Sequence, residues 1–343
     1  MSYVLPGIIT AEVGSNSHYQ ADTFRAEVAL NAPGGQDLDW WGADARKGML
    51  VDLRFTLDGD ERSLIIGEAD EIDIDPIHGT VSLAGRDLTA RLIEHRTQEA
   101  FQNKTASEVA TILAQRRGLK PVVTATTTMV SRYYADEHDR VSHSQFSKVS
   151  TEWDLLTWLA QHENFDLFVS GRELHFQPAV DPTKAEPYML AWDQDSRIGD
   201  MTMLKLHRSL TLAKDVVVEV RSHHSAKGQS FTRTSPAGAG GAKVQAGKAQ
   251  RYVFWRPNMT EDQAQKEADR LREEITRHER TCLIDIPGEL ELTPRDVVLI
   301  KGVGGWSQPY LVNTITRRIG FDGGFTQSIT IKNHNVESQA SVS

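Results

Sequence analysis

Two stretches at opposite ends of the sequence, residues 46–87 and 292–333, align without a gap at a constant separation of 246 residues. In both stretches, short runs of alternating apolar and polar residues are separated by turn residues, such as Asp58-Gly59 in the first. This alternation is typical of half-buried strands in an antiparallel sheet. The chain therefore contains either one β unit used twice or two β-meanders that are similar by chance.

A true repeat makes a prediction about individual residues. The constant separation pairs Leu53 with Leu299 and Leu83 with Ile329, and all four side chains are expected to point into barrel cores. Because a shift of one residue moves every side chain of a strand to the other face, copies of one unit should keep this register even at low identity. Chance similarity should instead give separations that change from strand to strand.

Other runs of the same kind extend the β pattern through most of the chain. In the C-terminal part, strands are expected at Tyr188–Trp192, Met203–His207, Val216–Val220, Tyr252–Trp255, Cys282–Ile286, Val297–Ile300, Tyr310–Ile315 and Phe325–Ile331. Many short strands with turns between them favour a barrel or a sandwich. We therefore expect a mainly β fold with α+β character, in which two similar β-barrel domains, residues 1–95 and 186–343, are joined by a small α/β module at residues 96–185.

Two helices are predicted from their N-terminal capping residues. The first, at residues 105–117, begins with Thr105 and Glu108 at the spacing of a capping box. The second, an inserted surface helix at residues 260–279, begins in the same way at Thr260. Its apolar stripe is narrow and its other faces are charged, so it should pack against one neighbour only.

A further helix and a tight hairpin adjoin each other at residues 151–177. Thr151 can cap this helix, with Asp154 three residues later. A two-stranded ribbon is marginally stable by itself in water, so the hairpin needs a helix to cover it. We expect Trp153 and Trp158 to provide that cover, because aromatic residues at helical spacing are usually part of a core.

The segment 222–250 interrupts the β pattern. It contains five glycines and four basic residues and no acidic residue. Such a composition has little to bury, which predicts a mobile loop. The loop is either simply solvated or becomes ordered against an acidic neighbour in an assembly.

Composition limits the classes of protein that this chain can represent. It has 343 residues, a net charge of −9 and 39% hydrophobic residues, which is ordinary for a globular protein of two or three domains. The negative charge argues against non-specific binding of nucleic acid. A single cysteine, Cys282, excludes an internal disulfide and indicates a small buried apolar residue. The N-terminus lacks the pattern of a signal peptide, and no apolar run is long enough for membrane insertion, so synthesis in a cytoplasm is expected.

One acidic and histidine-containing run, EHDRVSH, resembles a metal site only superficially. Its possible ligands are Glu137, His138, Asp139 and His143, together with Asp136 directly before the run. The two histidines are five residues apart in a run that looks extended, so they do not share one face of a helix. We predict no metal site here.

No other residue pattern indicates catalysis. Adjacent His223 and His224 would point to opposite faces of a strand. The sequence has no zinc-protease, nucleophile-elbow, phosphate-loop or dinucleotide-binding motif. We therefore predict no catalytic, metal-binding or cofactor-binding residue and no enzyme activity. A peptidoglycan-degrading enzyme remains the alternative, although such an enzyme needs an acid pair in a cleft.

Three segments together resemble a known family. They are VSLAGRDLTARL at residues 81–92, VSTEWDLLTWLAQHENFDLFVSGRELHFQP at 149–178, and the run from GELELTPRD to QSITI at 288–331. With the helix at 260–279 before the last strands, their order resembles the phage late control protein D family. This family comprises the baseplate hub proteins of long-tailed phages, including the Mu type, and relatives in bacterial injection machines.

The resemblance implies an architecture and a role. Family members have two similar barrels around a small α/β part, and three chains close into a ring. The implied function is a trimeric baseplate hub that adapts the six-fold tail tube to the three-fold central spike and leaves a channel for DNA. The implied partners are the tail tube or distal tail protein, the spike, other baseplate proteins and the tape measure protein, in a virion assembled in the host cytoplasm. The alternatives are the tail-tip enzyme and a hub subunit of a contractile injection or type VI secretion apparatus.

Overall fold

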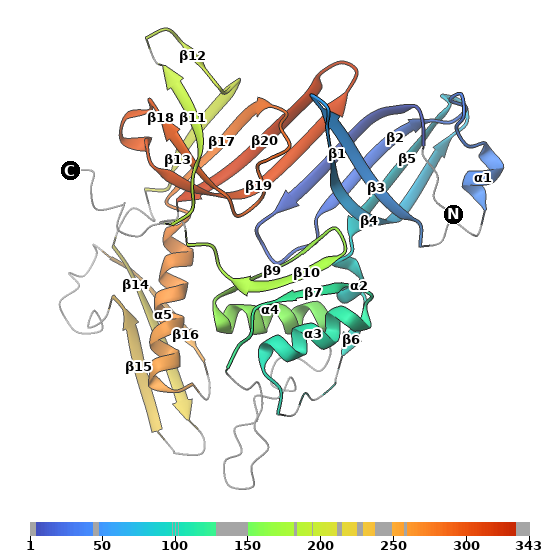
Figure 1. Ribbon diagram of the computed structural model, residues 1–343. Helices are drawn as coiled ribbons and strands as arrows, with labels where there is room; N and C mark the ends of the chain where they lie inside the picture. Colours follow the sequence, from blue (N-terminus) through green and yellow to red (C-terminus); the bar gives the residue numbers. More distant parts are fainter. Residues whose placement is uncertain are drawn as a thin grey trace.

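The computed structural model describes residues 5–43, 48–97, 99, 101, 103–127, 150–181, 184–193, 195–210, 215–224, 229–236, 249–256 and 259–333. These residues form a mainly β molecule with few helices (Figure 1). Among them, no helix combines the length and the apolar composition needed to span a bilayer.

Twelve strands form one large, mainly antiparallel sheet. Its longest path has the order β12-β11-β18-β19-β1-β2-β5-β4-β3, and β20, β17 and β13 continue from the other edge of β19. The strands are β1 (Ile8–Asn16), β2 (Thr23–Ala29), β3 (Leu50–Leu57), β4 (Asp60–Asp75), β5 (Thr80–Asp87), β11 (Tyr188–Asp193), β12 (Ile198–Gly199), β13 (Met203–Arg208), β17 (Arg280–Pro287), β18 (Val297–Lys301), β19 (Pro309–Gly320) and β20 (Gly324–Asn333). Short helices α1 (Leu38–Gly42) and α2 (Ala90–Ile93) and a 3-10 turn (Gly304–Trp306) connect them.

The two ends of the chain share this sheet, which corrects the expectation of two closed barrels. Strand β19 bonds to β18 with its first residues and to β1 with residues Thr314–Gly320, along the same edge. The sheet therefore continues from the C-terminal strands into the N-terminal ones, and no closed barrel is present in the described part of the chain. The β3–β4 hairpin instead reaches β20 through side chains, with the rings of Phe55 and Phe325 4.4 Å apart.

Two parts of the sheet nevertheless have the same strand order. Neighbouring strands follow β1-β2-β5-β4-β3 in the first part and β13-β17-β20-β19-β18 in the second, and every pairing is antiparallel. Each part encloses its own cluster of buried apolar residues. A β-bulge also interrupts the fourth strand of each part at the corresponding place, Asp70 in β4 and Asn313 in β19.

Rows of paired residues across the two parts give the register. The row Val13, Phe24, Gly85, Ala69 in the first part corresponds to the row Leu206, Cys282, Ile331, Val312 in the second. In this superposition Leu83 corresponds to Ile329, as predicted, and both are buried.

The predicted match of Leu53 with Leu299 is wrong, because Leu53 corresponds to Ile300 in the core. Fourteen residues separate Leu53 from Gly67, whereas ten separate Ile300 from the equivalent Tyr310. The connection from β19 to β20 is in turn longer than the connection from β4 to β5, by nearly as many residues. The constant separation of 246 residues therefore holds only for β5 and β20, because a shorter and a longer connection nearly cancel.

A compact α/β unit follows the first part of the sheet. Its three-stranded sheet has the order β7 (Lys120–Val123), β10 (Glu173–Pro178), β9 (Phe165–Ser170), and the short strands β6 (Arg96–Thr97) and β8 (Ser150–Thr151) pair beside it. Helices α3 (Ala106–Arg116) and α4 (Glu152–Glu163) pack against the three-stranded sheet. Both predicted capping boxes are confirmed, at Thr105 with Glu108 and at Thr151 with Asp154.

A third unit corrects part of the expectation of a mobile loop at residues 222–250, because the ends of the segment and residues 229–235 form strands, whereas residues 225–228 and 237–248 lie outside the described residues. Strands β14 (Asp215–His224), β15 (Gln229–Ser235) and β16 (Ala249–Trp255) form a separate sheet, and helix α5 (Glu261–Thr276) covers one face of it. The segment is low in apolar residues, but Phe231 adds to a face that Val216, Val218 and Val220 already make apolar. The capping box at Thr260 is confirmed, and the helix ends at Thr276, slightly earlier than expected.

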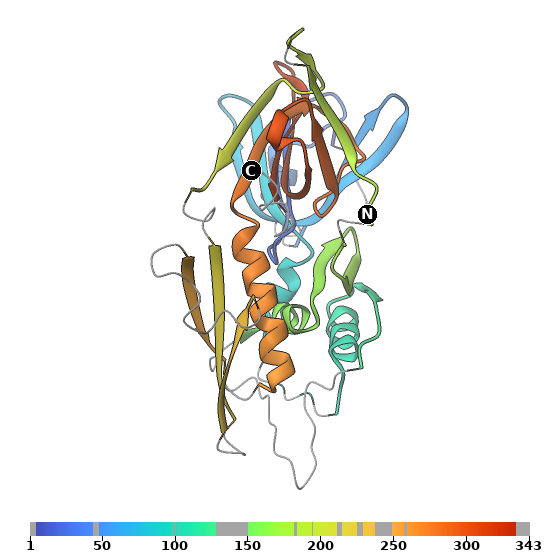
Figure 2. The same ribbon diagram turned by 90° about the vertical axis from the view of Figure 1, so that its left-hand side faces the viewer.

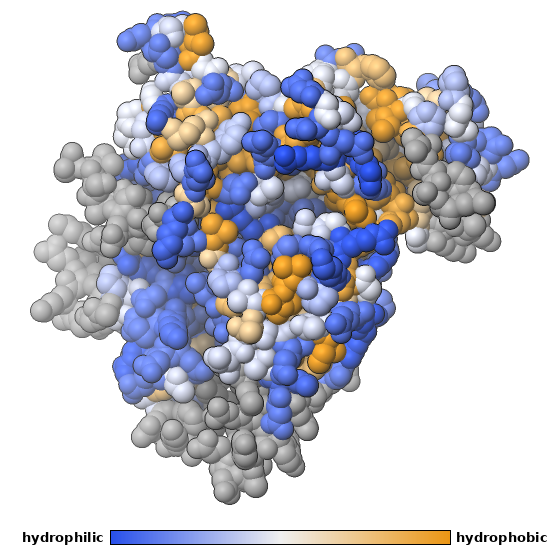
Figure 3. All heavy atoms as spheres, in the orientation of Figure 1, coloured by the Kyte–Doolittle hydropathy of each residue, from blue (hydrophilic) through white to orange (hydrophobic). Residues whose placement is uncertain are grey.

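The three units have a simple arrangement. In Figures 1 and 2 the large sheet lies above, and the α/β unit and the α5 unit lie below it. The surface around α5 and its sheet is strongly hydrophilic on the face seen in Figure 3. This agrees with the narrow apolar stripe of α5, where Ala264, Ala268 and Leu271 are buried.

Candidate functional site

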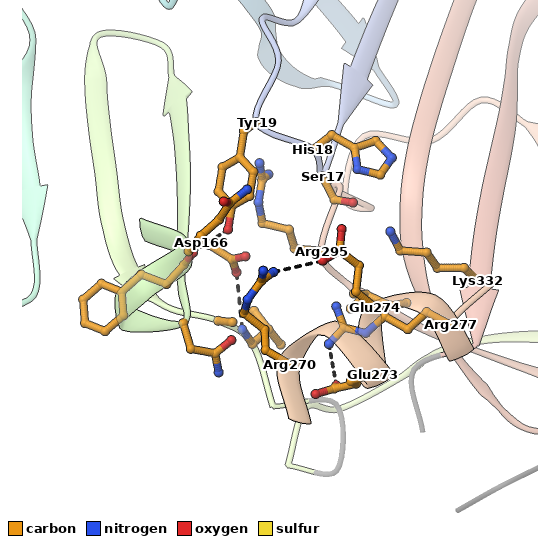
Figure 4. Close-up of a pocket in the computed structure, with 16 residues that line it drawn as sticks. Ser17, His18, Tyr19, Asp166, Arg270, Glu273, Glu274, Arg277, Arg295 and Lys332 are labelled. Carbon is orange, nitrogen blue, oxygen red and sulfur yellow. Dashed lines mark hydrogen bonds and ion pairs between the residues drawn. The ribbon is translucent and has the colours of Figure 1, made fainter. Parts of the chain in front are cut away.

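A cavity of about 170 Å³ lies where the large sheet, the α/β unit and α5 meet (Figure 4). Its lining is mostly polar and charged. The residues that line it are Ser17, His18, Tyr19, Gln161, Asn164, Phe165, Asp166, Ala179, Val180, Arg270, Glu273, Glu274, Arg277, Arg295, Leu311 and Lys332. Each of the three units contributes side chains, so the cavity exists only in the folded whole.

Helix α5 contributes charges that are already paired with one another. Arg270 bonds to Glu267 and Glu274, at 2.9 Å in each case, and Arg277 bonds to Glu273 at 2.5 Å. These partners are three or four residues apart, so they lie on the same face of the helix. The two glutamates of the cavity, Glu273 and Glu274, are therefore engaged in ion pairs and are not poised as an acid pair for hydrolysis.

Arg295 links the large sheet to the α/β unit. Its guanidinium donates to the Asn16 carbonyl at 3.2 Å and lies 3.9 Å from the ring centroid of Phe168. Burial lowers the pKa of Arg295, and the nearby carboxylate of Asp166 opposes that shift. Burial also raises the pKa of Asp166, and Arg295 opposes this second shift. The two groups therefore stabilise each other's charge in a poorly hydrated place.

Tyr19 connects the same two units by two hydrogen bonds. Its hydroxyl donates to the Phe165 carbonyl at 3.0 Å, and its own carbonyl accepts from the indole nitrogen of Trp153 at 2.9 Å. Burial raises the pKa of Tyr19 to about 12, so the hydroxyl stays protonated as a donor. The loop after β1 is thus fixed to both the helix and the hairpin of the α/β unit.

Lys332 is the least compensated charge at the cavity. It is only 8% exposed, and Figure 4 shows its ammonium end directed toward the other lining residues. Burial, and then the neighbouring Arg277, lower the pKa of Lys332 to about 8. In the described part of the chain, no carboxylate lies within ion-pair distance of it. Burial, and then the charge of Lys332, also lower the pKa of His18.

This arrangement favours fixing three units together over catalysis. Within the described residues, no group of three His, Cys, Asp or Glu side chains could hold a metal ion. Cys282 is buried as expected, and burial raises the pKa of its thiol to about 12, which keeps it from acting as a nucleophile.

The histidines and tryptophans singled out in the sequence have structural surroundings, where they belong to the described residues. The run from Asp136 to His143 lies outside the described residues. His223 contacts Ser230, with its Nδ1 atom 2.8 Å from the hydroxyl. Trp153 is buried in the core of the α/β unit, as predicted, whereas Trp158 is only partly buried at its edge, against His162.

Sequence reasoning missed Tyr19, Arg295 and Lys332. Each lies outside any motif, and each acquires its role from a segment far away in the sequence. Arg295 also adopts a backbone φ of 85°, which is uncommon for a residue with a side chain and which no sequence pattern announces.

No protein-family model matches the sequence, and a search of curated proteins finds no relative. The fold, in contrast, has clear counterparts among solved structures. The tail protein from Neisseria meningitidis MC58 is 15% identical, with a TM-score of 0.69, and the match covers 97% of this chain and 94% of that one. The 43 kDa tail protein of prophage MuSo2 from Shewanella oneidensis is 14% identical, with a TM-score of 0.64 and coverage of 97% and 95%.

This chain has the fold of phage tail proteins. The same fold extends to secretion machinery, because the E. coli c3393 protein, a component of the type VI secretion system, matches with a TM-score of 0.56 and 11% identity. That match covers 96% of this chain and 74% of the other. The resemblance read from the three sequence segments is therefore confirmed at the level of the fold.

Proposed function

We propose that this chain is a structural subunit of a phage tail, a baseplate hub in which three copies close into a ring. The observation that carries the proposal is the repeated strand order, β1-β2-β5-β4-β3 and β13-β17-β20-β19-β18, within a tail-protein fold. We interpret the two parts as copies of one unit, carried by residues 1–95 and 186–343 on either side of the α/β module at residues 96–185.

The repeat offers a solution to a symmetry mismatch. Three chains with two similar units each place six similar units around one circle. Such a ring presents a nearly six-fold surface to a six-fold tail tube and a three-fold surface to a central spike. Rings of this kind form when one surface of a subunit fits a different surface of the next, and the rotation closes.

The role implies partners and a location. The ring would contact the tail tube or distal tail protein on one side and the spike on the other, with further baseplate proteins and the tape measure protein nearby. DNA would pass through its channel without specific binding. The protein would be assembled in the host cytoplasm and end in the virion baseplate.

We also propose that the role requires no catalysis. The carboxylates Glu273 and Glu274 at the cavity are engaged by arginines of the same helix, which supports a structural use of these charges. A zymogram with peptidoglycan tests the alternative of a tail-tip enzyme. If this protein clears the peptidoglycan and an unrelated folded protein does not, the result would support the enzyme and contradict this proposal.

The mass of the assembled protein tests the hub. We expect a species of three times 38.3 kDa in light scattering of the pure chain, or after its tail partners are added. A strictly monomeric or dimeric chain inside native particles would contradict the trimeric hub.

A second candidate function rests on the similarity to the secretion-system component from E. coli. In that case the ring would serve a bacterial injection apparatus. Mass spectrometry of purified particles distinguishes the two, because a phage hub would be found together with capsid proteins and DNA, and an injection apparatus would have neither.

A further inference from the structure

Two strand edges of the large sheet carry unpaired backbone groups. Strand β13 pairs with β17 on one side and has no strand partner on the other in the described part of the chain. Strand β4 pairs with β3 only as far as Glu68, so the same edge has no strand partner over Glu71–Asp75. Open edges of this kind tend to pair with another chain unless they are covered.

The molecule already contains a pairing that shows how these edges fit together. In the superposition of the two parts, β13 corresponds to β1, and β4 corresponds to β19. Strands β1 and β19 are bonded to each other in this chain, in an antiparallel ladder from Thr10–Gly320 to Asn16–Thr314. Thus the first strand of one part, β1, binds the fourth strand of the other, β19, and the reciprocal pair of β13 with β4 is left open within the chain.

We propose that β13 of one copy pairs with residues Glu71–Asp75 of β4 in the next copy, in the register that β1 and β19 use within the chain. This inference rests on the proposed function, and it names the contact by which the ring closes. The β1–β19 ladder within the chain serves as the template for this pairing. Its pair Val13–Arg317 corresponds to Leu206 of one copy opposite Ile74 of the next. The template pair Gly14–Thr316 becomes His207 opposite Asp73, and Glu12–Arg318 becomes Lys205 opposite Asp75.

The chemistry of the two edges is complementary in this register. Glu12 and Arg318 form an ion pair of 2.6 Å between β1 and β19, and Lys205 and Asp75 carry the same two charges with the signs exchanged. In the single chain Oδ2 of Asp75 lies 2.6 Å from Nδ1 of His78, so Lys205 would approach this carboxylate as a further partner. On the other face, Leu206, which is 37% exposed in the single chain, would cover Ile74 at the rim of the first core. Opposite charges and apolar pairs directly across an antiparallel ladder both stabilise a sheet.

The positions of the two edges suit a ring. Strand β13 lies near one end of the molecule in Figure 1, and the β3–β5 strands lie at the opposite end. A contact between different surfaces at opposite ends is head-to-tail, and it closes into a ring when three rotations complete a circle. Every copy then contributes one edge of each kind, and no open edge remains at these two places.

Cysteine cross-linking of the full-length chain tests the register. The chain has one cysteine, Cys282, which is 1% exposed and therefore does not interfere. In the variant His207→Cys/Asp73→Cys, the two sulfurs should be close enough for a disulfide between copies, because paired residues in a ladder are within disulfide range. Oxidation should convert it into covalent dimers and trimers on a non-reducing gel, and nothing larger.

Two matched variants serve as controls. Glu12→Cys/Arg318→Cys is a directly opposed pair of the β1–β19 ladder, two positions from the equivalent pair Gly14–Thr316, so it should form a disulfide within one chain and stay at monomer mass on the gel. Lys205→Cys/Glu71→Cys places the two sulfurs four positions apart along the ladder, so it should give no cross-link between copies. Equal cross-linking of the matched and displaced pairs would overturn the proposed register.

Cross-linking together with the mass of the native protein separates the two proposals. A trimer by light scattering that gives no His207→Cys/Asp73→Cys cross-link would overturn this interface and leave the hub proposal standing. A chain that stays monomeric and uncross-linked at high concentration would also overturn the interface, because both edges belong to the chain itself. The hub proposal would then be decided on the native particle.

A charge exchange provides a second test. His207→Glu would place a carboxylate opposite Asp73 of the next copy, and should weaken trimer formation by about tenfold. Adding Asp73→Lys should restore it. Lys104→Gln, which also lowers the net charge by one but lies at the start of α3, should have no effect. Failure of the second substitution to restore assembly, in protein that is folded by circular dichroism, would contradict the pairing.

Discussion

At the scale of the residue, Lys332 shows how assembly of the fold can override the preference of a side chain. A lysine is normally exposed, yet this one lies 8% exposed between the large sheet and α5. Its ammonium group loses hydration on burial and is repelled by the nearby positive charge of Arg277, so the charged form of Lys332 is destabilised in the folded state. The folded protein tolerates this cost because the surrounding contacts hold three units together.

The pH dependence of stability checks this cost. The pKa of Lys332 is about 8 when folded, against an ordinary value of 10.5, so between these values the unfolded chain holds the proton and the folded chain does not. Stability contributed by this residue therefore rises with pH across that window. We expect Lys332→Met to be more stable than the wild type at pH 7, by about 3 kcal/mol at most, and to lose this advantage above pH 10.5.

The measurement is the free energy of unfolding in urea for both proteins at several pH values. Taking the difference between them removes the titration of all other groups. The exposed Lys301→Met serves as a control and should show no pH-dependent difference. A constant difference for Lys332→Met across the window would contradict the buried, charged lysine.

Trp153 carries a second prediction at this scale. It is 4% exposed in the core of the α/β unit, and its indole bonds to Tyr19 of the neighbouring unit. Trp153→Ala should cost about 3–5 kcal/mol, because it leaves a cavity and an unpaired carbonyl. Trp255→Ala, at a site 67% exposed, should stay within about 0.5 kcal/mol of wild type. Urea midpoints followed by circular dichroism decide this, and equal midpoints for both variants would contradict the packing role.

At the scale of the element, the three long helices begin in the same way. Thr105, Thr151 and Thr260 each cap a helix, and the backbone N–H of each donates to the side chain three residues later. The helix of the α/β unit also ends at Asn164 in the left-handed conformation, with φ of 55°. This ending turns the chain directly into β9, which explains why helix and hairpin adjoin without a linker.

Removal of a cap should destabilise the helix by a modest and measurable amount. Thr151→Ala deletes the oxygen that accepts from the Asp154 backbone, and should cost about 1 kcal/mol. Thr151→Ser should retain most of the stability. Thr127→Ala, at an exposed threonine outside any helix, is the matched control. An alanine variant as stable as this control would show that the cap contributes nothing.

At the scale of the whole molecule, the large sheet joins units that are far apart in the sequence. The pairing of Val13 with Arg317 connects the two ends of the chain, and Arg295 and Tyr19 tie the α/β unit beneath them. If three copies form the ring proposed above, the two similar parts alternate around it. Their relation should then be a rotation near 60° about the ring axis.

Electron microscopy of the assembled ring measures this rotation. We expect a view along the axis to show six similar lobes, with strict symmetry only at 120°. The outer α5 units should break the six-fold appearance, because each chain has one such unit and not two. Three lobes without a six-fold inner ring would contradict the alternation.

The sequence by itself determined the features that depend on near neighbours. Alternation located the strands of both halves, and capping residues located the starts of α3, α4 and α5. It also placed Leu83 and Ile329 at equivalent core positions. These predictions succeed because side-chain alternation and helix caps involve residues only a few positions apart.

The tertiary structure alone decided how these elements join. The alternation of β1 and β19 says nothing about their pairing, because residues some three hundred positions apart meet only through the path of the whole chain. For the same reason, Leu53 corresponds to Ile300 and not to Leu299, because the connections between the strands differ in length. A segment of low apolar content likewise forms strands because α5 packs against their apolar face. Burial of Lys332 and Arg295 likewise has no local signal, because the surfaces that bury them come from other units.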